Sequence, residues 1–310
     1  MDRSFTRSFD LRHIGAKRRA RPEPGGIIPI VKVFISADIE GVTGVVTWHQ
    51  CGTPSGEHYD WPFARRMMTH DVNAAIRGAR AAGATEIVVK DSHNTSKNLL
   101  IDQLEDGAQL ISGLGSGIHG MMEGIDATFD CAMLVGYHAM AGTTAGIMEH
   151  TYTGGVHRLW INGNLSGEMG MSAAMAGFFD VPIVFVSSDK AGCDEAAALI
   201  PGVATAAVKY GLGRYMGRVL HPSETGPLIE AAAEKAVRGL KSIGTIKAAE
   251  PSTYRIEFNR SEEADFAAKH PAATRVDGYT IEVVGATYEV AHQLAQNIIS
   301  FSANGIRSLN

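Results

Sequence analysis

Apolar segments of strand length alternate with amphipathic helical segments along most of this chain, and no other feature constrains the fold more. The predicted strands are 30–38 (IVKVFISAD), 85–93 (TEIVVKDSH), 129–138 (FDCAMLVGYH) and 181–189 (VPIVFVSSD). The helical patterns between and after them include 61–83, 168–179 and 193–200. Strands that are apolar throughout are buried on both faces, and strand–helix alternation produces parallel pairing. We therefore expect an α/β fold, with a mostly parallel sheet and helices on both faces.

Changes in charge and in hydrophobic pattern divide the chain into three parts. Residues 1–30 carry seven basic and three acidic side chains, and no apolar segment of the signal-peptide type follows them. We expect this part to be a disordered basic extension. Residues 31–205 hold the alternating pattern and form the larger predicted domain. Residues 206–310 contain two strand patterns and three helical patterns, which predict a smaller α+β domain.

Charge and cysteine content exclude several classes of protein. The net charge of −5 over 310 residues leaves no broad basic surface for nucleic acid. No apolar run approaches the roughly 18–20 residues of a membrane span, so we expect neither nucleic acid nor membrane as a partner. Cys51, Cys131 and Cys193 are far apart and form no disulfide framework or CxxC pair. This usage fits a reducing compartment and predicts a cytoplasmic protein.

Polar side chains of the same kinds follow three of the predicted strands. Asp38 and Glu40 come at the end of the first strand, His93 ends the second and His138 ends the third. Ligands of open parallel sheets bind outside the carboxyl ends of the strands. Residues two positions apart in an extended segment point to one side, so both carboxylates can face a single point. The sequence therefore predicts that these four side chains meet at one edge of the sheet.

Such a group of side chains is suited to a metal ion. Two close carboxylates repel unless a proton or a cation neutralises one of them. Mixed carboxylate and imidazole ligands favour zinc, manganese or cobalt over calcium. The four residues suffice for one metal, or nearly for two if a carboxylate bridges. Glu168 is a fifth candidate ligand, because it stands where a predicted hairpin (157–168, with an Asn-Gly turn) meets a helix.

Each of these residues also has an ordinary interpretation, and the case depends on their coincidence. A DxE sequence after a strand is commonly a solvated turn, and a lone histidine there is commonly a capping or surface residue. His150 lies in a Gly- and Thr-rich loop (142–155) near the same edge, where it can bind substrate or protonate a leaving amine. No nucleotide-binding loop or GxSxG nucleophile elbow accompanies these residues.

Several longer motifs resemble one known family. They are SADIEGVTG (36–44), KDSHNTSKNLL (90–100), LVGYHAMAGTTAGIMEHTY (134–152) and INGNLSGEMGMSA (161–173). In order and in spacing they are similar to the zinc-dependent D-aminopeptidases associated with dipeptide uptake. The resemblance runs from residue 31 to about 210 and continues more loosely to the C-terminus.

The resemblance implies a site, an activity and an assembly. The resemblance implies two zinc ions per subunit, with Asp38 as the bridge. The implied metal ligands are Asp38, Glu40, His93, His138 and Glu168. His150 matches the family's catalytic histidine. The implied reaction releases N-terminal, D-configured residues from short peptides by attack of a metal-activated water. Residues 31–205 are then the metal-binding catalytic domain, and the implied assembly is a homodecameric ring.

Three other functions remain open at this point. A dinuclear phosphoesterase uses similar ligands, and Asn94 supplies the amide that such sites often add. An amidase acting on a small non-peptide amide would need the same metal centre. A metal-binding ring without catalytic activity would hold zinc and turn over no peptide.

Overall fold

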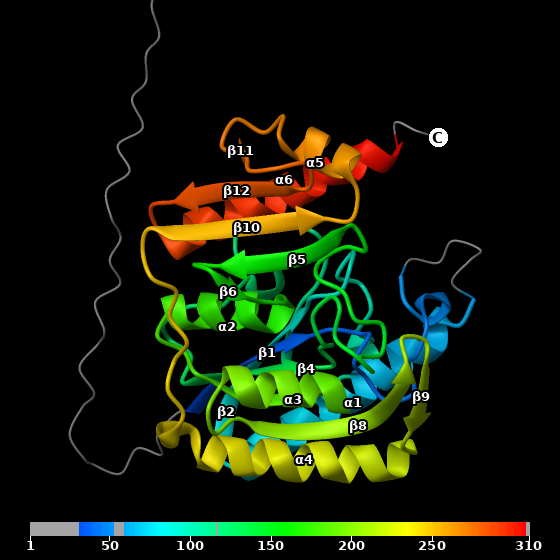
Figure 1. Ribbon diagram of the computed structural model, residues 1–310. Coiled ribbons are helices and arrows are strands. Elements are labelled where there is room, and N and C mark those ends of the chain that lie inside the picture. The colour runs from blue at the N-terminus through cyan, green and yellow to red at the C-terminus, as the bar shows by residue number, and fades with distance from the viewer. Residues whose placement is uncertain (1–30, 53–58, 116, 308–310) are drawn as a thin grey trace, which may run out of the picture.

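The computed structural model describes residues 31–52, 59–115 and 117–307 (Figure 1), so the predicted basic extension lies outside the described residues. The strands are β1 Val31–Ala37, β2 Ala84–Asp91, β3 Gln109–Ile111, β4 Cys131–Val135, β5 Val156–Ile161, β6 Asn164–Leu165, β7 Ile183–Asp189, β8 Ala204–Gly213, β9 Met216–Val219, β10 Ser252–Phe258, β11 Thr274–Arg275 and β12 Thr280–Gly285. The α-helices are α1 Trp61–Ala81, α2 Glu168–Phe178, α3 Lys190–Leu199, α4 Pro222–Arg238, α5 Ser261–Ala267 and α6 Tyr288–Arg307.

The larger sheet has seven strands in the order β3-β2-β1-β4-β7-β8-β9. Every neighbouring pair is parallel except β8 and β9, which are antiparallel. Side chains of β1 alternate between two cores: Val33 and Ile35 pack with residues of α1 and α4, whereas Phe34 packs with residues of α2. The expected α/β fold, with helices on both faces of a mostly parallel sheet, is confirmed.

The smaller sheet has five antiparallel strands in the order β11-β12-β10-β5-β6. Its β5–β6 hairpin turns at Asn162 and Gly163, whose φ angles of +49° and +81° suit the predicted Asn-Gly turn. The chain therefore enters this sheet before residue 205 and returns to the larger sheet with β7. The division into domains at 205 stays a prediction, since sheet membership alone does not define a domain.

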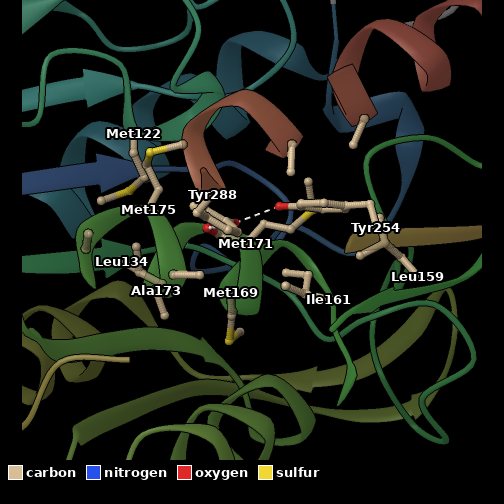
Figure 2. Packing of buried hydrophobic residues seen from close by; sticks show 14 of the residues in the cluster. Met122, Leu134, Leu159, Ile161, Met169, Met171, Ala173, Met175, Tyr254 and Tyr288 are labelled. Atoms are coloured by element: carbon tan, nitrogen blue, oxygen red, sulfur yellow. Dashed lines mark hydrogen bonds between the residues drawn. The ribbon is translucent and has the colours of Figure 1, made fainter. Parts of the chain in front are cut away.

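Helix α2 lies between the two sheets (Figure 1) and is buried on all sides from Glu168 to Gly177. Figure 2 shows Met171 of α2 beside Tyr254 and Tyr288, which come from β10 and α6. The same core reaches Leu134 of β4 on the larger sheet. A helix that is apolar around its whole circumference is suited to a fully buried place. Glu168, its first residue, is thereby fixed between two packed layers.

The β8–β9 hairpin was not predicted as part of the sheet. Its first strand, ATAAVKYGLG, is rich in alanine and glycine and interrupted by Lys209, so it lacks the composition of a strand. Pairing with β7 and β9 stabilises it in the fold.

In the described part of the chain, no helix is long and apolar enough to span a membrane. The three cysteines are buried and free.

Candidate metal centre

The carboxylates at the end of β1 are held by a close approach between two backbones. The Asp38 N–H donates to Val135 O of β4 at 2.8 Å, so pairing continues past the end of the strand. A Cβ atom on Gly41 would lie 1.8 Å from Tyr137 O, so only glycine fits there. The tight turn leaves the side chains of Asp38 and Glu40 only 2% and 1% exposed.

The histidines that follow β2 and β4 reach the same point. His93 Nδ1 lies 3.2 Å from Asp38 Oδ1 and 3.1 Å from Glu40 Oε2. His138 Nε2 lies 3.5 Å from Asp38 Oδ2. β2 and β4 flank β1 in the sheet, which is why residues far apart in sequence converge. The predicted meeting of these four side chains is what the structure shows.

Glu168 and His150 complete the group. Glu168 Oε2 lies 3.3 Å from His138 Nε2, and its Oε1 accepts the Tyr152 N–H at 2.7 Å. His150 Nε2 lies 3.6 Å from Glu168 Oε1. The His150 ring stacks on His138 with 4.0 Å between ring centroids. The six side chains are called the ligand cluster below: Asp38, Glu40, His93, His138, His150 and Glu168.

The ligand cluster divides into two sets that could each hold a metal ion. One set is Asp38, Glu40 and His93, and the other is His138, His150 and Glu168; within each, ligand atoms lie within 4.8 Å of one another. Asp38 turns one oxygen towards each set, which is the arrangement of a bridging carboxylate. His150, which we predicted as a catalytic residue, thus lies among the predicted ligands.

Hydrogen bonds to the backbone orient two of the imidazoles. His138 Nδ1 lies 3.0 Å from Ala139 O, and His150 Nδ1 lies 2.9 Å from Met148 O. A carbonyl oxygen can only accept, so each Nδ1 carries a proton and each Nε2 is the ring atom left to face the cluster. Metal-binding histidines are usually oriented by such a bond from the other ring nitrogen.

Unpaired polar atoms provide a direct test of whether a cation fits. Among the described residues, Asp38 Oδ2, Glu40 Oε2 and His138 Nε2 are buried without a hydrogen-bond partner. Most buried polar atoms in proteins are hydrogen-bonded, because leaving one unpaired is costly. All three atoms can act as metal ligands and all three face the cluster. The residues present therefore fit divalent metal ions.

The electrostatics of the cluster also indicate a need for positive charge. Burial raises the pKa of Asp38 to about 7, and the charge of Glu40 adds to this rise. Burial opposes a charged His93, but Glu40 and Asp38 outweigh it and raise the pKa to about 10. Burial is likewise outweighed at His138, whose pKa is raised well above its usual value by Glu168. The metal-free cluster therefore retains protons that a cation can replace.

A cavity of about 700 Å³ opens onto the ligand cluster, a volume that suits a small ligand. Five members of the ligand cluster line one end of it, namely Asp38, Glu40, His93, His150 and Glu168. The rest of its wall comes from the ends of β2 and β3, from the segments that follow β1, β2, β3 and β4, and from α6.

Three residues around the cluster were not anticipated from the sequence. Trp48 lines the cavity and meets the His150 ring edge-on at 5.0 Å. Tyr152 holds Glu168 through its backbone N–H. Lys209 is fully buried, and its Nζ donates to the carbonyls of Glu40, Val42 and Val45. Of the three, only Lys209 had a signal in the sequence, because a lysine stands out inside the mostly apolar segment ATAAVKYG.

Comparisons with known proteins agree with this geometry. The family described as D-aminopeptidase (peptidase family M55) matches residues 31–297. A D-aminopeptidase of Bacillus subtilis (strain 168) is 34% identical over 252 residues, which make up 81% of this chain and 89% of that protein.

A solved structure with the same fold is the Zn-dependent D-aminopeptidase DppA from Bacillus subtilis, described as a self-compartmentalizing protease. It matches with a TM-score of 0.84 and 32% identity, over 88% of this chain and 98% of that one. The resemblance carried by the sequence motifs is thus confirmed: the chain belongs to the M55 family of D-aminopeptidases.

Proposed function

We propose that this protein is a zinc-dependent D-aminopeptidase that removes the N-terminal residue from short peptides and holds two zinc ions per subunit. The observation that carries the proposal is the ligand cluster, whose unpaired buried ligand atoms face a cavity large enough for a small peptide. Membership of the M55 family supports the peptidase activity over a phosphoesterase, an amidase or a scaffold.

The two sets of ligands divide the zinc ions between them. Asp38, Glu40 and His93 would hold one ion, and His138 and Glu168 would hold the other, with Asp38 placed to serve both. When bound, such a pair supplies Lewis acidity that polarises a carbonyl and lowers the pKa of water. Three ionised carboxylates balance most of the charge that two divalent cations bring. This balance supports two ions better than one.

His150 is proposed to move a proton at Nε2. Burial lowers its pKa, and the neighbouring charge of His138 adds to this, so the ring is neutral at working pH. Its Nδ1 proton is committed to Met148 O, which leaves the Nε2 lone pair free to accept a proton and return it to the leaving amine. Trp48 and His138 pack on the ring and fix its orientation.

The proposed assembly is a homo-oligomer, with a decameric ring as the specific expectation, in the cytoplasm. A relative described as self-compartmentalizing supports the oligomer. The β8–β9 hairpin exposes Leu212, Tyr215 and Met216, with 67%, 50% and 60% of their surfaces accessible, and such a patch suits a subunit contact. Light scattering coupled to size-exclusion chromatography measures the mass of the particle directly; a monomer would contradict the proposal.

The activity is tested with the p-nitroanilides of D-alanine and L-alanine. The purified protein is dialysed against a chelator and assayed before and after addition of Zn²⁺. We expect zinc to restore cleavage of the D-form. Cleavage of the L-form alone would retain the metal mechanism and overturn the chirality. Cleavage of neither, with zinc bound, would contradict the peptidase proposal and favour one of the three other functions.

A further inference from the structure

Lys90 lies on the wall of the same cavity, on the penultimate position of β2. Its side chain is buried, with 4% of its surface exposed. The ammonium group donates to Asp91 O at 2.5 Å and to Ser96 Oγ at 2.9 Å. A lysine ammonium has three donors, so these two bonds leave one for a ligand in the cavity.

The charge of Lys90 is not matched by a close carboxylate. Among the described residues, no acidic side chain forms an ion pair with it within 4.0 Å. The Asp91 carboxylate is bound instead by the Asn98 and Leu99 amides at 2.6 and 2.8 Å. Glu123 also lines the cavity, but it forms no ion pair with Lys90 within 4.0 Å, and its Oε2 accepts the His119 N–H at 3.0 Å. Burial lowers the pKa of Lys90, and these two acids offset only part of that effect.

A buried cation that has hydrogen bonds but no close carboxylate is costly, and buried charges are usually paired. Among the described residues that line the cavity, Lys90 is the only lysine or arginine. The cavity therefore has a metal-binding end and, apart from the metals, one fixed positive charge. An anionic group on the ligand would supply the missing partner.

We propose that Lys90 binds the C-terminal carboxylate of a short peptide substrate, and so selects peptides whose free carboxylate lies close to the cleaved bond. This inference rests on the proposed aminopeptidase function and adds a specificity determinant to it. A peptide enters with its amino end at the ligand cluster, and a short one brings its carboxylate into the same cavity. A long peptide or an amide offers Lys90 no anion.

The alternative is that Lys90 only ties the Ser96 turn to β2. That turn has independent support, because Ser96 O accepts the Gly113 N–H at 2.7 Å and the Ser112 hydroxyl at 2.8 Å. Lys90→Met should therefore fold. A structural role would affect all substrates alike, whereas a role in carboxylate binding affects only those with a free carboxylate.

The first experiment compares kcat/KM for D-alanyl-glycine and D-alanyl-glycinamide. In the wild type we expect a preference for the acid of about 10- to 100-fold, the usual strength of a hydrogen bond to a charged group. Lys90→Met should lose that preference while cleaving the amide as before, and Lys90→Arg should restore part of it. Lys190→Met, which removes an exposed lysine on α3, is the matched control. An unchanged preference in Lys90→Met would overturn the inference.

The second experiment measures binding without turnover, so that failure of the proposed function is seen separately. Calorimetry is run on the zinc-loaded protein with N-acetyl-D-alanine and with its amide. We expect the acid to bind at least about tenfold more weakly to Lys90→Met than to Lys190→Met. Equal binding would overturn the carboxylate site. Binding that depends on Lys90, with no hydrolysis of either dipeptide, would retain the site and refute the aminopeptidase function.

Discussion

Two groups of buried polar side chains contact α2, and their different surroundings show how the fold uses such residues. The ligand cluster contributes Glu168, the first residue of the helix. The second group lies deeper in the shared core: Tyr288 Oη donates to Met171 O at 2.8 Å and lies 2.6 Å from Tyr254 Oη, which lies 2.9 Å from His292 Nδ1. Figure 2 draws the bond between the two tyrosines. This second group is called the tyrosine group below.

The tyrosine group satisfies most of its own hydrogen bonds, whereas the ligand cluster leaves several ligand atoms unpaired. The histidines make the contrast clear. Burial lowers the pKa of His292 to about 3, so it is neutral. Burial acts in the same direction on His93, but Glu40 and Asp38 raise its pKa to about 10. A buried histidine among neutral partners thus stabilises the fold, and one among carboxylates is poised to bind a cation.

Removing one histidine from each group gives the largest expected difference. His93→Ala should lose bound zinc and reduce kcat/KM by at least about 1,000-fold, because metal ions contribute several kcal/mol to such reactions. His292→Phe should keep both. Zinc content by plasma emission spectrometry and the D-alanine p-nitroanilide assay measure the two quantities. Wild-type zinc content in His93→Ala would remove it from the ligands.

His150 tests whether every member of the ligand cluster is a ligand. If it moves a proton, His150→Ala should keep two zinc ions per chain and lower kcat by about 10²- to 10⁴-fold, the usual contribution of general acid–base catalysis. The same two measurements apply. Loss of zinc in this variant would show that His150 is a ligand in the second set, and full activity would remove it from the mechanism.

Zinc affinity should depend on pH, because protons and zinc compete for the same atoms. The raised pKa values of Asp38, His93 and His138 mean that the metal-free cluster holds protons between pH 6 and 8. Each proton displaced should make zinc bind up to about tenfold more tightly per unit rise in pH. Competition with a chelator at pH 6, 7 and 8 measures this slope. A flat profile would contradict the charge balance described for the cluster.

The tyrosine group should show the smallest effect. Tyr254→Phe removes the hydroxyl between Tyr288 and His292 and should lower the free energy of unfolding by about 1 kcal/mol. Zinc content and kcat/KM should not change. Denaturant unfolding with excess zinc measures stability, and the peptidase assay serves as the control. A large loss of zinc would show that the two groups are not independent.

The convergence of the ligand cluster could be predicted from sequence because one physical rule governs it. Parallel strands carry their terminal residues to one edge of a sheet, so Asp38, His93 and His138 had to be near one another once the strands were assigned. Glu168 was found from its position between a hairpin and a helix. These assignments needed only local patterns and one rule of topology.

Other features could not be found in this way, because they depend on contacts that no local pattern encodes. Lys209 is stabilised by carbonyl groups 164 to 169 residues away in sequence. The β5–β6 hairpin is evident from its turn, but its pairing with β10 is not. In the sequence, nothing distinguishes Lys90 from an ordinary strand residue. Its burial in the cavity wall, which only the structure shows, marks it as a candidate for ligand binding.

The position of α2 has a consequence for how the molecule loses its structure. The helix belongs to the cores of both sheets, and it begins with Glu168. If the smaller sheet detached, one side of α2 would be exposed to water and the second set of ligands would lose its anchor. Zinc held at Glu168, as we propose, would therefore oppose separation of the two sheets. Occupancy of the metal centre should make the two layers unfold as a single cooperative unit.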